Sequence, residues 1–320
     1  MHKRTIGSLD VSVVGLGCNN FGGRIDGAAT DRVVHAAMEA GITFFDTAEV
    51  YGGGGSSEEL LGRALGDRRD EVVIATKFGM ELPDAVDGGA SPERVRAGVV
   101  GSLRRLGTDC IDLYQLHVPD PDVPIAETLG ALDELVREGK VRQVGHSNFD
   151  AAQIDEAERA AVDAGTIRFV CTQNEWSLLA RDVEDDVLPA VDRHGLAFLP
   201  YFPLSSGVLT GKYQRDQPLG SDWRLTNLPP ERRERFLDDA RLRVVEDLTA
   251  FAEDHGRTLL DLAFSWLASH AAVASVIAGA TRPEQVRANA NAAGWTLSDD
   301  DLDEVDRITR TTTGRERPSR

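Results

Sequence analysis

The strongest constraint on the fold is an alternation, repeated eight times, of a short apolar run with a segment whose apolar residues recur at helical spacing. Each run has the length and the β-branched content of a buried strand. The eight runs cover residues 13–17, 42–47, 72–77, 110–117, 141–147, 169–173, 196–202 and 273–279. Strands that alternate with helices form parallel sheets, and eight such units favour closure. We therefore predict an α/β fold, the (β/α)8 or TIM barrel.

Two further features complete the predicted architecture. Residues 4–12 place the turn residues Gly7 and Ser8 between two short β-like runs, which predicts an N-terminal β-hairpin. Long irregular stretches at residues 79–90 and 205–235 follow the third and the seventh strand. Long loops in a compact domain are usually functional, and loops that follow the strands lie on the face where such barrels keep their active sites.

Composition and charge restrict the partners. The 320 residues are 41% hydrophobic and 28% charged, which supports a large core, and the net charge is −18. Such an acidic surface argues against nucleic acid or an anionic membrane as the main partner. No uncharged apolar run approaches the roughly 18 residues of a membrane span, and no signal-like segment opens the chain. We expect one cytoplasmic domain over residues 1–320, with a flexible tail over 308–320 and a monomeric or weakly homo-oligomeric state.

The cysteines and histidines indicate neither disulfides nor a metal site. Cys18, Cys110 and Cys171 form an odd, scattered set without a CxxC pair, which is typical of reduced thiols in a cytosolic protein. The seven histidines form no HExxH motif and no paired cluster. We therefore expect no metal.

Polar residues that can handle protons stand at the ends of three consecutive predicted strands. The second strand ends at Asp46, with Tyr51 just beyond it. The third ends at Lys77 and the fourth at His117. Neighbouring strand ends in one small barrel face one mouth, so these four side chains can meet. Each alone has an ordinary structural interpretation, as a solvated or paired charge or a turn residue, but the coincidence of four favours a chemical role.

The chemistry that this set supports is proton donation. A free tyrosine has a pKa of about 10 and is a poor acid near neutral pH. An ammonium about 4 Å away stabilises the phenolate by roughly 4 kcal/mol at an effective dielectric constant of 20, or about three pKa units. Asp46 would keep Lys77 charged, and a neutral His117 would orient a carbonyl oxygen. Tyr51 is then a general acid for an oxygen that gains negative charge.

The chain resembles the aldo-keto reductase family over essentially its whole length. The matching segments are "GLGCNNFGG", "FFDTAEVYG", "SEELLG", "VVIATKFG", "SLRRLGTDCIDLYQLH", "REGKVRQVGHSNF", "TQNEWSLL", "YFPLSSGVLTGK" and "SVIAGATRPEQVRANA". The resemblance implies a (β/α)8 barrel, a nicotinamide cofactor (NADPH/NADP+) and reversible reduction of a small carbonyl compound. It places the family's catalytic tetrad on Asp46, Tyr51, Lys77 and His117.

The resemblance also implies a cofactor site, built from groups for the carboxamide, the nicotinamide ring, the pyrophosphate and the adenosine. These residues are Gly17, Cys18, Asn19, Asp46, Ser147, Asn148, Gln173, Tyr201, Phe202, Pro203, Leu204, Gly207, Leu209, Gly211, Lys212, Gly279, Thr281, Arg282, Gln285 and Asn289. A helix that starts near Pro283 would offer backbone N–H groups to a phosphate. Arg282 carries the fork that suits a 2′-phosphate and so favours NADPH, the alternative being a surface charge.

The substrate pocket is expected between the loops after the strands, with Phe21, Tyr51, Phe78, His117 and Trp223 as its residues. The substrate itself stays open and includes sugars, pyridoxal and small aromatic aldehydes. Three other functions also stay open. The first is an NAD(P)-dependent dehydrogenase acting on a sugar hemiacetal or an alcohol. The second is a non-catalytic, NADPH-binding regulatory subunit of a membrane channel. The third is an isomerase or aldolase without a nicotinamide cofactor.

Three residues or runs depart from the family pattern, and none of them touches the tetrad. The glycine run 52–55 is one residue longer than usual, which is expected to shift the loop beside Tyr51. Trp176 stands where a tyrosine is frequent, and His146 stands where an apolar residue is usual. We expect Trp176 and His146 to be packing residues.

Overall fold

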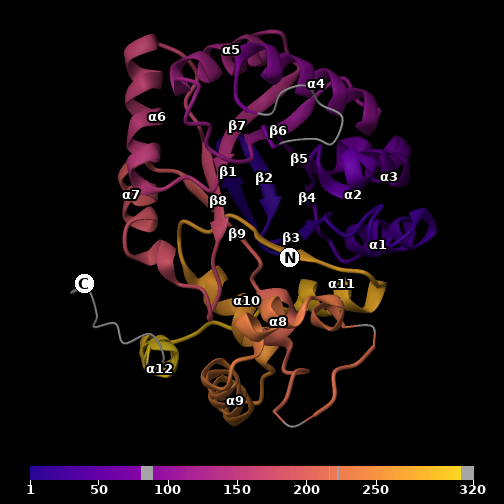
Figure 1. Cartoon of the computed structure of the whole chain (residues 1–320), viewed down its shortest axis with the longest axis vertical. Coiled ribbons are helices and arrows are strands. Elements are labelled where there is room, and N and C mark those ends of the chain that lie inside the picture. Colours follow the sequence, from indigo (N-terminus) through magenta and orange to yellow (C-terminus); the bar gives the residue numbers. More distant parts are fainter. Residues whose placement is uncertain (81–88, 216, 222, 311–320) are drawn as a thin grey trace.

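The computed structural model describes residues 1–80, 89–215, 217–221 and 223–310, and it is a barrel of parallel strands surrounded by helices (Figure 1). The strands run β10-β3-β4-β5-β6-β7-β8-β9 around the sheet, and every pairing in it is parallel. Residues 272–274, just before β10, exchange backbone hydrogen bonds with Phe198 of β9. This link closes the ring, so the predicted (β/α)8 barrel is confirmed.

All eight predicted strands are present, with ends that differ by a few residues from the apolar runs. They are β3 (Val14–Gly17), β4 (Phe44–Asp46), β5 (Val73–Phe78), β6 (Ile111–Leu116), β7 (Val141–Ser147), β8 (Cys171–Glu175), β9 (Ala197–Tyr201) and β10 (Val276–Gly279). The predicted hairpin is also present, as β1 (Lys3–Ile6) paired antiparallel with β2 (Leu9–Ser12).

The helices begin where the sequence supplies caps. In α4, Ser91 caps the first turn by accepting a hydrogen bond from the backbone N–H of Arg94, and Pro92 opens the helix. The helices of the ring are α1 (Gly27–Glu39), α3 (Ser56–Leu65), α4 (Pro92–Leu106), α5 (Ile125–Arg137), α6 (Ala151–Ala164), α7 (Val187–His194), α10 (Leu259–Ser269) and α11 (Pro283–Ala292). The further helices are α2 (Tyr51–Gly54), α8 (Pro230–Leu237), α9 (Asp239–Asp254) and α12 (Asp299–Arg310).

Two cores lie on the two sides of the barrel wall. The larger fills the space between the strands and the helices. The smaller lies inside the barrel, where Ile6, Leu9 and Val11 of the hairpin pack against inward side chains such as Phe44 and Leu113. The hairpin therefore closes the end of the barrel at which the strands begin, and the opposite end remains for a site.

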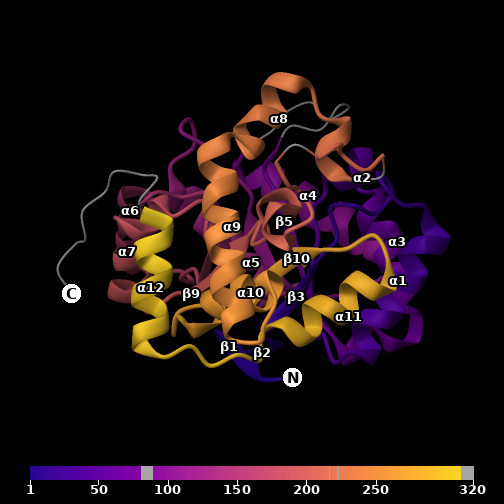
Figure 2. The same cartoon turned by 90° about the horizontal axis from the view of Figure 1, so that it is seen from below.

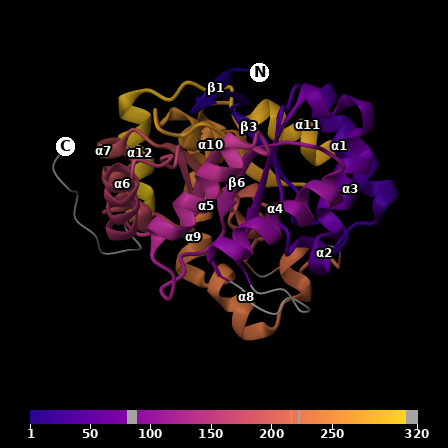
Figure 3. The ribbon, with the colours of Figure 1, turned by 90° about the horizontal axis from the view of Figure 1, so that it is seen from above.

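The long stretch after β9 lies at that opposite end. Figures 2 and 3 show α8 projecting beyond the ring of helices, and Figure 2 places it opposite the hairpin. Residues 205–235 were expected to be irregular, but they contain two short 3₁₀ segments, Ser205–Thr210 and Arg224–Asn227, and most of α8. Of residues 79–90, most lie outside the described residues.

The C-terminal helix corrects one boundary. The tail was expected to begin at residue 308, but α12 continues to Arg310 and packs beside α9 (Figure 2). Arg181 binds Asp306 at 2.7 Å and donates to Thr309 Oγ1 at 2.6 Å, which explains why the last turn is held. Residues 311–320 lie outside the described part of the chain.

Candidate active site

Three neighbouring strands deliver the four proton-handling residues to one place. Asp46 is the last residue of β4, Lys77 lies one residue before the end of β5, and His117 follows β6 directly. Tyr51 opens the short helix α2. Side chains alternate across a strand, so Ala75 and Lys77 of β5 point into the barrel while Ile74 and Phe78 point toward the helices.

Lys77 forms a buried ion pair beneath Tyr51. Its Nζ donates to Asp46 Oδ2 at 2.6 Å and to the carbonyl oxygen of Thr47 at 2.9 Å. The same nitrogen lies 5.2 Å from the centroid of the Tyr51 ring. Burial lowers the pKa of Lys77, but the negative charges of Asp46 and of an ionised Tyr51 outweigh it, and the net pKa is raised. Lys77 is therefore a cation at neutral pH.

The pKa of Tyr51 differs from the expectation. Burial raises it by more than the Lys77 ammonium lowers it, and Asp46 raises it further, so the pKa of the phenol stands above its ordinary value of 10.0. The expected net decrease is wrong for the free site, because the loss of hydration around the buried phenolate outweighs its attraction to the ammonium. Lys77 still acts in the expected direction.

His117 is held as a neutral imidazole next to Tyr51. Burial, together with the Lys77 charge, lowers the pKa of His117 to about 3. The two rings lie edge to face, with centroids 5.8 Å apart. Within the described part of the chain, His117 Nδ1 is buried without a hydrogen-bond partner. The ring lines the cavity, and a neutral imidazole has one donor nitrogen and one acceptor nitrogen for hydrogen bonding.

Amide side chains orient Asp46 from the other side. Gln173 Nε2 donates to Asp46 Oδ1 at 3.0 Å, and Gln115 Nε2 approaches the same oxygen at 3.4 Å. Because Oδ2 binds Lys77, both carboxylate oxygens are fixed. The carboxylate is 3% exposed, and these donors offset the loss of water around its charge.

A second hydrogen-bonded group forms the adjoining wall of the site. Asn148 Nδ2 donates to the carbonyl oxygen of His117 at 2.9 Å, and the Tyr201 hydroxyl donates to Asn148 Oδ1 at 2.8 Å. Ser147 Oγ donates to the carbonyl oxygen of Gln173 at 2.7 Å. Asn148 has a φ of 62°, which asparagine tolerates better than most residues, and Phe202 has a φ of 51°, a strained value for a bulky side chain. Such strain is concentrated at functional sites.

The glycine run beside Tyr51 is required by the backbone. Gly52, Gly53, Gly54 and Gly55 all have positive φ, between 71° and 107°. At Gly52 a Cβ atom would also lie 2.7 Å from the carbonyl oxygen of Phe21. The run lets the chain turn sharply from Tyr51 into α3, and this explains why glycine, and no other residue, follows the phenol.

These groups line one cavity of about 580 Å³ at the C-terminal end of the barrel. Most of the residues predicted for the site lie on its wall. They are Gly17, Asn19, Asp46, Tyr51, His117, Ser147, Asn148, Gln173, Tyr201, Phe202, Pro203, Leu204, Gly207, Lys212, Gly279, Thr281, Gln285 and Asn289. Lys77 is fully buried beneath the wall, where it contacts the lining residues Asp46 and Tyr51.

Seven other predicted residues do not line this cavity. Cys18, Phe21, Phe78 and Leu209 are buried in the core, with no exposed surface. Phe78 follows the inward-pointing Lys77, so it points outward and stacks on Tyr114. Their side chains therefore have no place in the pocket that we expected them to form.

The remaining three lie near the cavity and outside its wall. Gly211 ends a 3₁₀ turn with a φ of 72°. Trp223 packs against Tyr213, with ring centroids 5.1 Å apart, and so anchors the loop after β9. Arg282 is the exposed N-cap residue of α11, next to the lining residue Thr281.

The cavity also includes residues that the sequence analysis missed. They are Asn20, Arg24, Met80, Val118, Ser206, Thr210, Arg224, Leu260, Ile277, Ala278, Ala280 and Ala288. Arg24 and Arg224 are far apart in the sequence. Burial lowers the pKa of Arg224, and the charge of Arg24 lowers it further. Along the described chain neither has a carboxylate partner. The motif "NNFGGR" and the position of Arg224 after β9 were the available signals.

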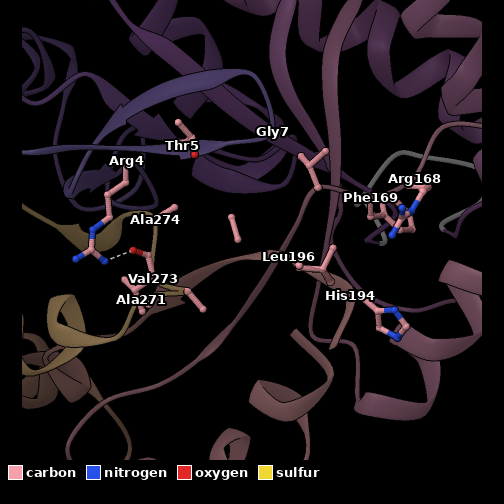
Figure 4. Close-up of a pocket in the computed structure, with 14 residues that line it drawn as sticks. Arg4, Thr5, Gly7, Arg168, Phe169, His194, Leu196, Ala271, Val273 and Ala274 are labelled. Atoms are coloured by element: carbon pink, nitrogen blue, oxygen red, sulfur yellow. Dashed lines mark hydrogen bonds between the residues drawn. The ribbon is translucent and has the colours of Figure 1, made fainter. Parts of the chain in front are cut away.

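A larger cleft, of about 850 Å³, lies at the other end of the barrel beside the hairpin (Figure 4). Its charged groups are already paired. Arg4 donates to the carbonyl oxygens of Ala268, His270 and Val273, and His194 binds Asp155 at 2.6 Å. Since nothing in it resembles a reactive set, we place the candidate site in the smaller cavity.

The two atypical residues near the site are packing residues, as expected. Trp176 is buried against Trp266 and Phe198, and His146 stacks on Phe149 with ring centroids 4.2 Å apart. Across the described ranges, no cluster of three or more His, Cys, Asp or Glu side chains could hold a metal ion, and no helix is long and apolar enough to cross a membrane.

Comparison with known proteins agrees with this geometry. The model of the aldo/keto reductase family matches residues 13–310. A probable voltage-gated potassium channel subunit beta of Arabidopsis thaliana is 37% identical over 290 residues, which cover 89% of this chain and 88% of that protein. The aldo-keto reductase YhdN of Bacillus subtilis (strain 168) is 34% identical over 312 residues, covering 95% and 92%.

The solved structures give the same result. A glycerol dehydrogenase from Gluconobacter oxydans superimposes with a TM-score of 0.84 at 32% identity, over 99% of this chain and 98% of that one. The resemblance inferred from the sequence motifs is thus confirmed, and the chain belongs to the aldo/keto reductase family.

Proposed function

We propose that this protein reduces an aldehyde or ketone to the alcohol with NADPH as the reductant. The observation that carries the proposal is the buried Asp46–Lys77 ion pair beneath the Tyr51 phenol, at the wall of a cavity that the neutral His117 also lines. Family membership supports carbonyl reduction in general. The arrangement supports the same chemistry independently, because it provides a proton donor beside a group that can bind a carbonyl oxygen.

Each residue of the tetrad has a separate part in the proposed reaction. When bound, the nicotinamide cofactor supplies a hydride to the carbonyl carbon. His117 binds the carbonyl oxygen and aims it at Tyr51, whose hydroxyl gives up its proton as the oxygen gains charge. Lys77 stabilises the phenolate that forms, and Asp46 keeps Lys77 charged and in place. In the reverse direction the phenolate accepts the proton of an alcohol.

The residues that line the cavity support a dinucleotide as its ligand. Amide and hydroxyl groups of Asn148 and Ser147 lie at one wall, and the aromatic ring of Tyr201 stands beside them. Lys212 and Thr281 also line the cavity, and Thr281 lies two residues before α11 begins. A helix start offers backbone N–H groups to a phosphate. Arg282, at the N-cap of this helix, is the residue that we propose for the 2′-phosphate and for the preference for NADPH.

Arginine and lysine side chains give this cavity a local charge opposite to that of the whole protein. The chain carries a net charge of −18, yet Arg24, Lys212 and Arg224 all line the same cavity. Arg224 also lies over the ring of Phe202, 5.4 Å from its centroid. Two arginines without a carboxylate partner across the described chain repel each other, and an anion between them would remove this repulsion. We propose that the anion is the cofactor's pyrophosphate.

Arg224→Gln is expected to weaken NADPH binding about 10-fold or more, because a charge-assisted hydrogen bond contributes about 1.5–3 kcal/mol. The measurement is a fluorescence titration of NADPH at two salt concentrations, and the variant should show the weaker dependence on salt. Arg232→Gln, on the exposed surface of α8, is the matched control and should leave the affinity unchanged. Equal affinities of Arg224→Gln and wild type would exclude this role of Arg224.

The direct test of the proposed function is cofactor consumption. Oxidation of NADPH is followed by absorbance with para-nitrobenzaldehyde as a generic carbonyl substrate, and the assay is repeated with NADH. We expect turnover that prefers NADPH and yields the alcohol in equal amount. Absence of NADPH binding would contradict the proposal and favour the isomerase or aldolase class.

Two other functions have specific support. The similar Gluconobacter protein is described as a glycerol dehydrogenase, which favours the oxidising direction on an alcohol or a sugar hemiacetal. Faster turnover with NAD+ and a polyol than with NADPH and an aldehyde would establish it. The Arabidopsis relative is described as a potassium channel subunit, which favours a regulatory, cofactor-binding role. Tight NADPH binding without turnover on any carbonyl, with a channel that co-purifies, would support that function.

A further inference from the structure

A buried charge pair stands behind the candidate site and is not part of its cavity wall. Glu49 comes two residues before Tyr51, and Arg94 lies in the first turn of α4. Their side chains are 2% and 9% exposed and form an ion pair. Neither residue lines the cavity, so neither can touch a substrate or a cofactor there. The proposed chemistry leaves this pair unused.

Glu49 connects the segment that carries Tyr51 to the strand that carries Lys77. Its carboxylate oxygen Oε1 accepts a hydrogen bond from the backbone N–H of Gly79, at 3.0 Å. Its own backbone N–H donates to the carbonyl oxygen of Lys77, at 3.1 Å. Glu49 therefore binds the backbone at Lys77, in β5, and again at Gly79, just after the strand. These two bonds tie the backbone two residues before Tyr51 to the end of the strand that carries Lys77.

Arg94 fixes the carboxylate from the outer side. Its NH2 group donates to the same Oε1 atom of Glu49. The helix makes room for it, because a Cβ atom at Gly98 would lie 2.8 Å from Arg94 NH1 and 2.6 Å from the Tyr114 hydroxyl. Within the described residues, Arg94 Nε and the Tyr114 hydroxyl are buried without hydrogen-bond partners. The absence of a side chain at Gly98 therefore leaves space for the Arg94 guanidinium, although Arg94 Nε and the Tyr114 hydroxyl stay without partners in the described part of the chain.

Stability alone does not account for such a pair. Removing two charges from water costs several kcal/mol per ion, and apolar residues of similar volume are often neutral or stabilising in their place. Burial raises the pKa of Glu49, with Arg94 acting against it and the more distant Glu58 adding to it. A costly carboxylate that binds the backbone N–H of Gly79, beside a backbone bond from the same residue to Lys77, indicates that its value lies in geometry.

We infer that Glu49 and Arg94 are positioning residues, which hold the Tyr51 phenol at the distance from Lys77 that proton donation needs. This inference rests on the proposed function, since it assigns to the pair the placement of the proposed proton donor. The groups that act electrostatically on Tyr51 are Lys77, Asp46 and Cys18, and the ring of His117 packs against it. Of these, Lys77 is the cation whose effect the pair controls.

The chain contains a matched control at the opposite end of the same strand. Asp112 Oδ2 accepts a hydrogen bond from the backbone N–H of Ile74 in β5, at 2.8 Å, and binds Arg69 at 2.7 Å. Its side chain is 1% exposed. As at Glu49, a buried carboxylate binds an arginine and a backbone N–H in or next to β5, and here Arg142 also lies 3.2 Å from Asp112 Oδ1. Asp112 lies at the end of β5 that is remote from the candidate site.

The first experiment compares Glu49→Gln and Asp112→Asn. Both substitutions keep the shape and an acceptor oxygen and remove the charge. For Glu49→Gln we expect a fall in kcat of about 10-fold, with the KM for NADPH within about two-fold of wild type. Asp112→Asn is expected to lower the unfolding midpoint and to keep kcat. A fall in kcat that is equal in both variants would show that the pair acts through general stability and would overturn the inference.

The second experiment measures the Tyr51–Lys77 interaction without using activity. The pKa of Tyr51 is read by carbon NMR of labelled tyrosine, and Tyr51→Phe assigns its signal among the four tyrosines. Lys77→Met is introduced into wild type and into a Glu49→Leu/Arg94→Leu background, in which the charge pair is absent and no buried charge is left alone. In the wild-type background Lys77→Met should raise the Tyr51 pKa, because the ammonium lowers it.

The size of the rise in the Tyr51 pKa on Lys77→Met tests whether the pair positions Tyr51 relative to Lys77. If the pair sets the distance, the rise in the Glu49→Leu/Arg94→Leu background will be less than half of the rise in the wild-type background. Equal rises in two folded backgrounds would overturn the inference. If wild type shows no turnover with any carbonyl while the difference in the rises is present, the proposed function has failed and the positioning role stands.

Discussion

The Tyr51→Phe variant is expected to reduce carbonyl substrates about 10²- to 10⁴-fold more slowly than wild type, the range for loss of a positioned general acid. The substitution removes the hydroxyl that donates the proton. The neighbouring His117 cannot donate a proton in its place. His117 has a pKa of about 3 and so carries no proton to give as a cation near neutral pH. The rate is measured as single-turnover oxidation of NADPH with saturating aldehyde.

Two further observations make this prediction specific to proton donation. NADPH affinity should stay within about two-fold of wild type, since a loss confined to the transition state changes kcat and leaves binding unaffected. Tyr114→Phe is the matched control. Its hydroxyl is buried, lies outside the cavity wall and has no hydrogen-bond partner among the described residues, so wild-type rates are expected. Full activity of Tyr51→Phe would exclude Tyr51 as the proton donor.

The parts of the fold and site that follow from local pattern could be predicted from the sequence. The apolar runs identify the eight strands because a buried parallel strand is apolar on both faces. Once the strands are placed, the topology of a closed barrel requires that residues at neighbouring strand ends face one mouth. Asp46, Lys77 and His117 could therefore be grouped without any contact information, and Tyr51 followed from its distance of five residues along the chain.

Side-chain direction could be predicted only where the strand register is known to one residue. Lys77 and Phe78 are adjacent, so if one points into the barrel the other must point out. Phe78 was nevertheless assigned to the substrate pocket, because only its nearness in sequence was considered. Cys18 and Phe21 lie in the loop after β3, where no alternation applies, and their burial was not visible in the sequence.

The remaining features depend on contacts between distant parts of the chain. Arg24 and Arg224 are separated by about two hundred residues, and their approach results from the fold of the long segment after β9. The partnership of Glu49 with Arg94 likewise requires the position of α4 against β5. The pKa of Tyr51 depends on burial, which is a property of the packed site, and so a charge argument from sequence gave the effect of Lys77 but not the net result.

Lys77→Met is expected to lower kcat for carbonyl reduction by roughly 10³-fold, because the ammonium stabilises a phenolate about 4 Å away by roughly 4 kcal/mol at an effective dielectric constant of 20. The variant should also be less stable by about 3–5 kcal/mol, since it leaves the carboxylate of Asp46 buried without its cation. The measurements are kcat with saturating aldehyde and the free energy of unfolding in urea.

The pH dependence gives the sign of the Lys77 effect. Alcohol oxidation needs the phenolate, so its rate rises as the pH passes upward through the pKa of Tyr51. Without Lys77 that pKa is higher, and the rise should move to higher pH. The contribution of Lys77 to stability behaves differently. Its folded pKa is raised above the unfolded value of about 10.4, so this stability is fully present at neutral pH and is lost only as the pH rises through the folded pKa.

Adding Asp46→Asn to Lys77→Met separates the two effects. In the double variant no charge is left unpaired, and the amide oxygen can still accept the hydrogen bond that Gln173 donates to Asp46. Much of the lost stability should therefore return, because the penalty of the single variant comes from the isolated carboxylate. The activity should not return, because the phenolate still lacks its cation. Recovery of kcat together with stability would mean that Lys77 acts by holding the fold and has no direct effect on Tyr51.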